Sequence, residues 1–180
     1  MNAIRQRRLS RPGGFTMIEL MVVVAIIAVL ATVAAPSFKD AILSNKLAGF
    51  ANSFVSSVQL ARSEAIKRNS TVRVCRSADG TSCATSGTWQ QGWIVFHDIN
   101  NDQAVSSGET VIQVQGQLSS DYHFTGNSYN IVFQPLGGGA GIASLILCRA
   151  VPSPGPQERA ITVSPTGRAS VSTTRTSVCT

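Results

Sequence analysis

The sequence predicts an α+β protein in which a long N-terminal helix packs against antiparallel β-sheets. Two observations carry this prediction. Apolar residues run almost unbroken over 20–35 and then recur every three or four residues as far as residue 65, which is the period of a helix. From residue 71 the pattern changes to short alternating or β-branched segments with turn residues between them. We expect strands within 71–76, 92–98, 129–134, 143–149, 160–164 and 168–172.

The charge of the 180-residue chain is concentrated before Gly14. Fifteen Lys and Arg against nine Asp and Glu give a net charge of +6. Four arginines and no acidic residue precede Gly14, so 11 basic and 9 acidic residues follow it, a net charge of +2. The basic segment therefore indicates orientation at a membrane rather than a nucleic-acid partner. The arginines are Arg5, Arg7, Arg8 and Arg11.

The apolar segment 20–35 is short for a membrane span, because 16 helical residues rise about 24 Å and the hydrocarbon core is about 30 Å thick. Starting the helix at Phe15 closes that gap and places Glu19 inside the membrane or at its edge. A carboxylate at mid-bilayer costs about 2.5–3.5 kcal/mol on insertion scales, so Glu19 needs a partner there. The alternative is a glutamate that reaches the headgroups from a helix end.

A cleaved secretory signal also begins with basic and then apolar residues. Here, however, the small pair Gly13-Gly14 precedes the apolar segment, and Glu19 interrupts it. The segment RPGGFTMIELMVVVAIIAVLATVAAPSF resembles the class III leader and first helix of type IV pilins and type II secretion pseudopilins, with matches at Gly14-Phe15, Glu19 and Pro36. The resemblance implies cleavage between Gly14 and Phe15 by a prepilin peptidase and N-methylation of Phe15. It also implies that Glu19 meets the new amino terminus, in its own helix or on a neighbouring subunit.

The helical pattern continues beyond Pro36, since proline inside a membrane helix kinks it without having to end it. One helix is therefore expected from Phe15 to about Arg68. Its second half carries an apolar stripe that we assign to core packing rather than to a cofactor. The predicted organisation is a leader (1–14), a transmembrane or filament-core helix (15–36) and a globular domain (37–180) that includes an amphipathic helix (37–68). The stripe consists of Leu47, Ala51, Phe54, Val58, Ala61 and Ala65, and the opposite face of Asn45, Asn52, Ser56, Ser63 and Lys67.

Four cysteines form an even set beyond the apolar segment. In a periplasmic domain they predict two disulfides. Three connectivities are possible, and the simplest pairs Cys75 with Cys83 across a short turn and Cys148 with Cys179. A zinc site is not expected, because neither His97 nor His123 stands at a zinc-type spacing from a cysteine.

The segment 98–109 places Asp98, Asn100, Asp102 and Glu109 at the first, third, fifth and twelfth positions of an EF-hand loop. Gln103 stands where that loop requires glycine, and the flanking residues predict strands instead of helices. Asp and Asn also collect in ordinary turns. We therefore expect no metal and no other cofactor, with calcium in this loop as the alternative.

Two other features have simple structural explanations. Trp89 and Trp93 could stack on bases, but burial against the sheet is the expected use. The glycine-rich segment 137–141 has neither the lysine nor the following helix of a phosphate loop, so it predicts a flexible hairpin connection.

Three segments beyond the apolar segment restrict the resemblance to one branch of these proteins. The segments LARSEAIKRN (60–69), GWIVFHDINND (92–102) and ITVSPTGRASVS (161–172) resemble the GspH/FimT branch of minor pilins and minor pseudopilins. That branch implies a helix packed on two β-sheets, a position at or near a filament tip, and no enzyme activity. Neither histidine lies in a sequence context typical of a catalytic pair.

The resemblance leaves three functions open: a minor type IV pilin that helps to initiate pilus assembly, a FimT-like minor pilin that binds DNA during natural transformation, and a minor pseudopilin of a type II secretion system. The implied partners are other major and minor pilins, the prepilin peptidase, the inner-membrane assembly machinery and, for the second function, DNA. The expected location is the bacterial inner membrane, crossed once, with the C-terminal domain in the periplasm and the chain incorporated into a pilus or pseudopilus.

The DNA-binding alternative rests on the C-terminal segment 149–180, which has a net charge of +3. Its single acidic residue is Glu158, and its basic residues are Arg149, Arg159, Arg168 and Arg175. FimT-like DNA receptors resemble it through a Gly-Arg-x-Arg element, of which Gly167-Arg168-Ala169-Ser170 supplies only the first half. The alternative, which we favour, is that Gly167 makes a turn between two strands while Arg168 stays solvated.

Overall fold

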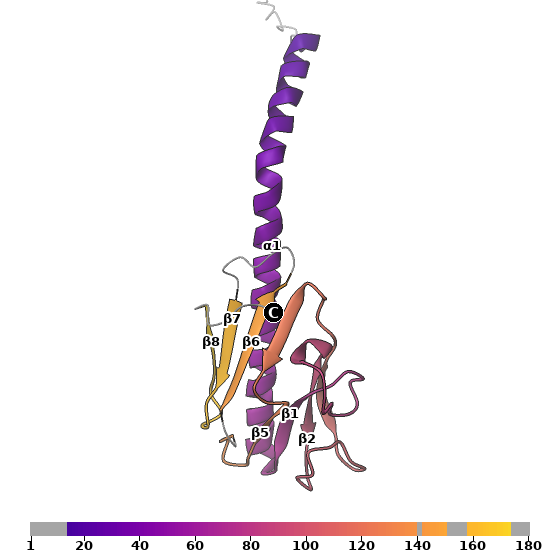
Figure 1. The fold of residues 1–180 in the computed structure, drawn as a ribbon, viewed down its shortest axis with the longest axis vertical. Helices are drawn as coiled ribbons and strands as arrows, with labels where there is room; N and C mark the ends of the chain where they lie inside the picture. Colours follow the sequence, from indigo (N-terminus) through magenta and orange to yellow (C-terminus); the bar gives the residue numbers. More distant parts are fainter. Residues whose placement is uncertain (1–13, 140–141, 151–157, 174–180) are drawn as a thin grey trace, which may run out of the picture. The chain divides into compact units, whose positions relative to one another are not determined.

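The computed structural model describes residues 14–139, 142–150 and 158–173 (Figure 1). The chain divides into two compact units, Met1–Ala41 and Ile42–Thr180. The described residues form a helix α1 (Met17–Arg68), a 3₁₀ helix η1 (Trp89–Gln91) and the strands β1 (Val72–Arg76), β2 (Trp93–His97), β3 (Val111–Gln115), β4 (Tyr122–Gly126), β5 (Asn130–Phe133), β6 (Ala143–Arg149), β7 (Glu158–Val163) and β8 (Ala169–Ser172).

Helix α1 begins at Met17, two residues later than the sequence predicts, because Thr16 is its N-cap. The amide of Glu19 donates to Thr16 Oγ1 at 3.3 Å, and the amide of Thr16 donates to Glu19 Oε2 at 3.4 Å. This reciprocal pair is a capping box, which satisfies two amides that the first turn leaves without partners. At its other end the predicted limit is confirmed, because α1 ends at Arg68, and it continues through position 36.

Among the described residues of the second unit, eight strands form two antiparallel sheets. The first has the order β3-β2-β1-β5 and the second the order β4-β6-β7-β8 (Figure 1). All six segments predicted as strands are confirmed. The sequence analysis missed β3 and β4, which lie at the edges of their sheets. Both contain exposed or half-exposed positions, so the apolar pattern is weaker there than in the central strands.

The apolar stripe of α1 forms the centre of the core, which confirms its predicted packing role. Its six members are each at most 1% exposed, whereas the polar face opposite is exposed. One side of each sheet packs into the same cluster, for example Val72 and Val74 of β1 and Leu145 and Leu147 of β6. The helix therefore joins the two sheets through one continuous core.

Phe54 lies at the middle of an aromatic group within that core. Its ring centroid is 5.1 Å from those of Trp89, Trp93 and Phe124, with edge-to-face geometry in each pair. Both indole nitrogens have partners: Trp93 Nε1 donates to Ser57 Oγ at 3.0 Å, and Trp89 Nε1 donates to the Ser128 carbonyl at 2.9 Å. Because both tryptophans are 0% exposed, their predicted burial is confirmed and neither can stack on a base.

The glycine-rich segment was predicted to be a hairpin connection. Locally it forms a hairpin, in which Phe133 and Gly139 make an antiparallel bridge, but the strands that it joins do not pair with each other. It connects β5 of the first sheet to β6 of the second (Figure 1). Up to residue 139 it is a turn in which the Gly137 amide donates to the Gln134 carbonyl at 2.8 Å. The amide of Gly139 donates to the Pro165 carbonyl at 2.8 Å, which ties this turn to the one between β7 and β8.

Candidate functional site

The predicted processing point lies immediately before helix α1. Gly14 and Phe15 have no regular secondary structure, and Phe15 is 82% exposed. A Cβ atom added to Gly14 would meet no other atom within 4 Å. The peptide bond that the resemblance marks for cleavage is therefore accessible, while the preceding residues 1–13 lie outside the described part of the chain.

Glu19 is held at the same place by the capping box. Its carboxylate contacts the backbone nitrogen of Thr16, the residue directly after Phe15. The structure thus brings Glu19 within one residue of the amino group that cleavage after Gly14 would create. A Thr-x-x-Glu pattern before an apolar run is a helix-start signal, so this contact could have been found from the sequence.

The first unit exposes large apolar side chains along α1. Phe15, Met17, Ile18 and Met21 are 70% exposed or more. Within the part of the chain that the structure describes, no helix is sufficiently long and apolar to traverse a membrane. A contiguous apolar surface on this scale marks a binding surface for another protein or a membrane. The others that exceed half exposure are Leu20, Val22, Val24, Ile26, Ile27, Val29, Leu30 and Phe38.

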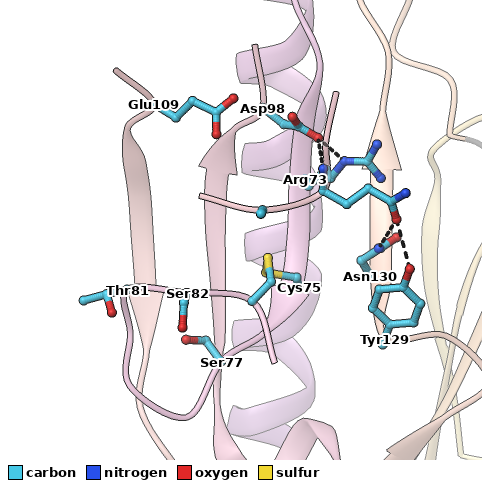
Figure 2. The surroundings of a disulfide bond; sticks show 12 residues. Arg73, Cys75, Ser77, Thr81, Ser82, Asp98, Glu109, Tyr129 and Asn130 are labelled. Atoms are coloured by element: carbon cyan, nitrogen blue, oxygen red, sulfur yellow. Dashed lines mark hydrogen bonds and ion pairs between the residues drawn. A yellow bond between two sulfur atoms is a disulfide. The ribbon is translucent and has the colours of Figure 1, made fainter. Parts of the chain in front are cut away.

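On the second unit, the Cys75–Cys83 disulfide is confirmed. Figure 2 shows the disulfide at Cys75. It lies on the side of the first sheet that faces away from the main core, in a small second cluster with Ile94 and Phe96. Cys148 is also disulfide-bonded. Its predicted partner Cys179 lies outside the described residues, so that pairing stays a prediction.

The loop between β2 and β3 brings together three acids that the sequence analysis singled out. One carboxylate oxygen from each of Asp98, Asp102 and Glu109 lies within 4.8 Å of the other two. Asp98 is fully buried, Glu109 is half-buried and Asp102 is exposed. Val105 of the same loop packs on the disulfide cluster, so the disulfide and the loop support each other.

The C-terminal arginines do not form one group. Arg168 is exposed and Arg159 half-buried, whereas Arg149 is only 5% exposed and is therefore poorly accessible to an external ligand such as DNA. Arg175 lies outside the described residues. Gly167 makes the turn before β8, as the structural alternative predicted, with its amide donating to the Ser164 carbonyl at 2.8 Å.

The turn at Gly167 packs against the last turns of α1. This contact was not predicted from the sequence as a possible site. A Cβ atom at Gly167 would lie 3.3 Å from Arg62 Cδ, and Arg62 Nε donates to the Gly137 carbonyl at 3.0 Å. Lys67 and Arg68 follow on the same helix and both pair with Glu64. No signal in the sequence indicated that Arg62 would lie beside the turn that precedes Arg168, because only folding brings these residues together.

A single helix that carries an exposed apolar segment after a processing motif, and then packs on two antiparallel sheets, defines the type IV pilin-like class. Residues 51–167 match the family model described as Type II transport protein GspH, and residues 9–35 match the prokaryotic N-terminal methylation motif. The first match covers more than half of the chain, and the chain belongs to the GspH family.

Among solved structures, the chain is similar to the type IV minor pilin FimU of Pseudomonas aeruginosa in two crystal forms. The identities are 16% and 14%, the TM-scores 0.55 and 0.51, and the matches cover 71% and 68% of this chain and 89% of each FimU chain. The minor pseudopilin EpsH from the type 2 secretion system of Vibrio cholerae matches at 12% identity and a TM-score of 0.48, over 68% of this chain and 92% of that one. No curated protein matches the chain. The likeness to FimU shows the fold.

Proposed function

We propose that the chain is a minor type IV pilin that takes part in pilus assembly or initiation at the filament tip. The observation that carries this is the exposed apolar helix of the first unit, most of which lies within the matched methylation motif of residues 9–35. Such a surface needs apolar surroundings, and a membrane before assembly and a filament core after it both provide them. A role as minor pseudopilin would use the same surface in a secretion machine.

In this proposal the globular domain lies in the periplasm, and the chain is anchored in the inner membrane until it joins other pilins. The prepilin peptidase cleaves after Gly14, and Phe15 becomes the N-methylated terminus. Glu19 then exchanges the Thr16 amide for the new ammonium group, of its own helix or of a neighbouring subunit. A carboxylate and an ammonium attract far more strongly in apolar surroundings than in water.

The experiment is a Glu19→Gln variant expressed in a host that assembles type IV pili. We expect the variant to reach the membrane at the parent's level, because the apolar segment is unchanged. Its amount in sheared filaments should fall by at least about tenfold, equivalent to about 1.4 kcal/mol, since the amide cannot neutralise an ammonium group.

The matched control is Asp121→Asn, which removes a carboxylate from the second unit. It should enter filaments like the parent. Intact mass of the membrane-extracted parent checks that the mature chain begins at Phe15. Normal incorporation of the Glu19 variant would contradict the proposed pairing, and incorporation of the parent into a secretion pseudopilus alone would favour the pseudopilin role.

One observation supports DNA binding as a second candidate. The turn that ends at Gly167 lies against Arg62, so exposed Arg168 follows a turn that packs on the basic end of α1. With Lys67 and Arg68, four basic residues stand against Glu64, a net charge of +3. Phosphate groups are the natural ligands of such an end, and contacts of this kind carry no base specificity.

A further inference from the structure

We propose that the loop between β2 and β3 binds a divalent cation of the calcium type through Asp98, Asp102 and Glu109, with the side-chain oxygen of Asn100 as a fourth ligand. This goes beyond the assembly function, because the site lies in the second unit and uses none of the residues near the processing point.

The negative charge of the three neighbouring carboxylates favours the binding of a cation. Three carboxylates contribute oxygens that lie within 4.8 Å of one another. Unit charges about 4 Å apart repel by about 4 kcal/mol at the effective dielectric constant near a protein surface. Within the described residues, Arg73 is the basic residue that forms an ion pair with the cluster, through Asp98. Two negative charges remain, which a divalent cation would balance.

A buried oxygen of Asp98 provides an independent indication. Asp98 is 0% exposed, and its Oδ2 accepts from Arg73 Nε and from the Gln103 amide at 3.3 Å. Its Oδ1 is buried and accepts no hydrogen bond from any residue that the structure describes. Figure 2 shows the side chain of Glu109 extending toward Asp98, whose carboxylate contacts Arg73. A buried carboxylate oxygen without a partner is costly, and a metal ion is the partner that this arrangement of acids can hold.

The loop backbone removes the objection that Gln103 replaces the glycine of an EF-hand. Gln103 has a φ of +69°, so it adopts the left-handed conformation for which that glycine is needed. The amide of Asp102 donates to Asn100 Oδ1 at 3.0 Å, and that of Ala104 donates to Asp102 Oδ1 at 2.9 Å. These hydrogen bonds bend the loop so that its acidic residues lie close together.

In an EF-hand, two helices flank the loop and hold its ends. Here the strands β2 and β3 hold the ends of the loop. Asp98 follows β2 and Glu109 precedes β3, and these strands pair directly. The pairing holds the two ends of the loop together, and Glu109 Oε1 accepts the Ile99 amide at 2.7 Å across them. The first and last ligands of the loop are therefore brought together without a change in fold.

The donor set identifies the class of ion. All the candidate ligands are carboxylate or amide oxygens, which suit calcium and magnesium and not zinc. Calcium tolerates irregular geometry from loop ligands, whereas magnesium demands a near-ideal octahedron, so the irregular loop favours calcium.

The test is isothermal titration of the full-length chain in detergent with CaCl₂ after treatment with EDTA, together with thermal unfolding in EDTA and in calcium. We expect one site with a dissociation constant of about 10⁻⁴–10⁻³ M, as in extracellular calcium modules, and a higher Tm in calcium. Asp102→Asn should weaken binding by at least about tenfold, and because Asp102 is exposed this variant should fold.

The control is Asp121→Asn, which removes a carboxylate outside the loop and should bind calcium like the parent. Absence of both heat and a Tm shift at 10 times the upper expected constant, about 10⁻² M, would overturn the proposal. So would unchanged binding by Asp102→Asn. Binding of magnesium in preference to calcium would refute the assignment of the ion.

Discussion

At the scale of single residues, Gly167 shows how one position connects the two sheets. Its φ of +76° lies in the left-handed region, and an added Cβ would stand 2.5 Å from the Gly137 carbonyl. The turn before β8 can therefore meet the turn after β5 only if residue 167 has no side chain. The same contact places the peptide before Arg168 against α1.

Gly167→Ala should lower the free energy of unfolding by about 1–3 kcal/mol, because the strained backbone and the overlap act together. Urea unfolding followed by the fluorescence of the two buried tryptophans measures this. The control is Gly116→Ala, since an added Cβ there meets nothing within 4 Å and the backbone is not left-handed. Equal unfolding midpoints for the two variants would contradict the explanation.

At the scale of elements, α1 is attached to the sheets by a polar contact inside an apolar core. Ser57 is fully buried; its hydroxyl accepts from Trp93 Nε1 and donates to the Ser53 carbonyl at 3.0 Å. The hydroxyl therefore links a helix to the second strand of the first sheet. Because Trp93 is buried, water cannot replace the hydroxyl as the partner of the indole nitrogen. Loss of this hydrogen bond therefore lowers the stability of the protein.

Ser57→Ala should destabilise the protein by about 1–3 kcal/mol, the cost of leaving a buried donor unpaired. The neighbouring Ser56 is exposed, so Ser56→Ala is the matched control and should change stability by less than about 0.5 kcal/mol. Chemical denaturation of the full-length chain in detergent compares them. A Ser57 variant as stable as the Ser56 variant would show that the contact contributes nothing.

At the scale of the whole molecule, charge is distributed unevenly. The residues after Gly14 carry a net charge of only +2, although the end of α1 with Arg168 carries +3. In the second candidate function, we therefore expect DNA to bind at this local group. The burial of Arg149 leaves fewer phosphate contacts than the four arginines of the C-terminal segment suggest.

If the second candidate function holds, duplex DNA should bind weakly and lose affinity steeply with salt. Two or three phosphate contacts predict a slope of log K against log salt of about −2 to −3. Arg168→Ala should reduce the steepness by about 1. The control is Lys46→Ala, because Lys46 is exposed near the start of the second unit, about 33 Å along α1 from Arg68. Identical salt slopes for both variants would exclude Arg168 from DNA binding.

The features that could be predicted from the sequence depend on patterns among residues that are close together in the chain. The core stripe and the six predicted strands follow from residue periodicity, which reports burial within a few residues. The Cys75–Cys83 disulfide spans only eight positions, so proximity favoured it. The processing motif is a contiguous segment, and its match to the methylation family needed no fold.

Only the tertiary structure decided which distant residues meet, because such contacts depend on how the sheets pack rather than on any local period. It placed β3 and β4 at sheet edges, and it put Arg62 beside the turn at Gly167. It also buried Asp98 with Arg73, which lies 25 positions earlier in the chain, and left one carboxylate oxygen without a partner. The class of fold and the N-terminal motif could be predicted from the sequence, because both depend on contiguous residues. The packing of helix on sheets determined where charged side chains can reach a ligand, since burial and charge balance arise between elements far apart in sequence.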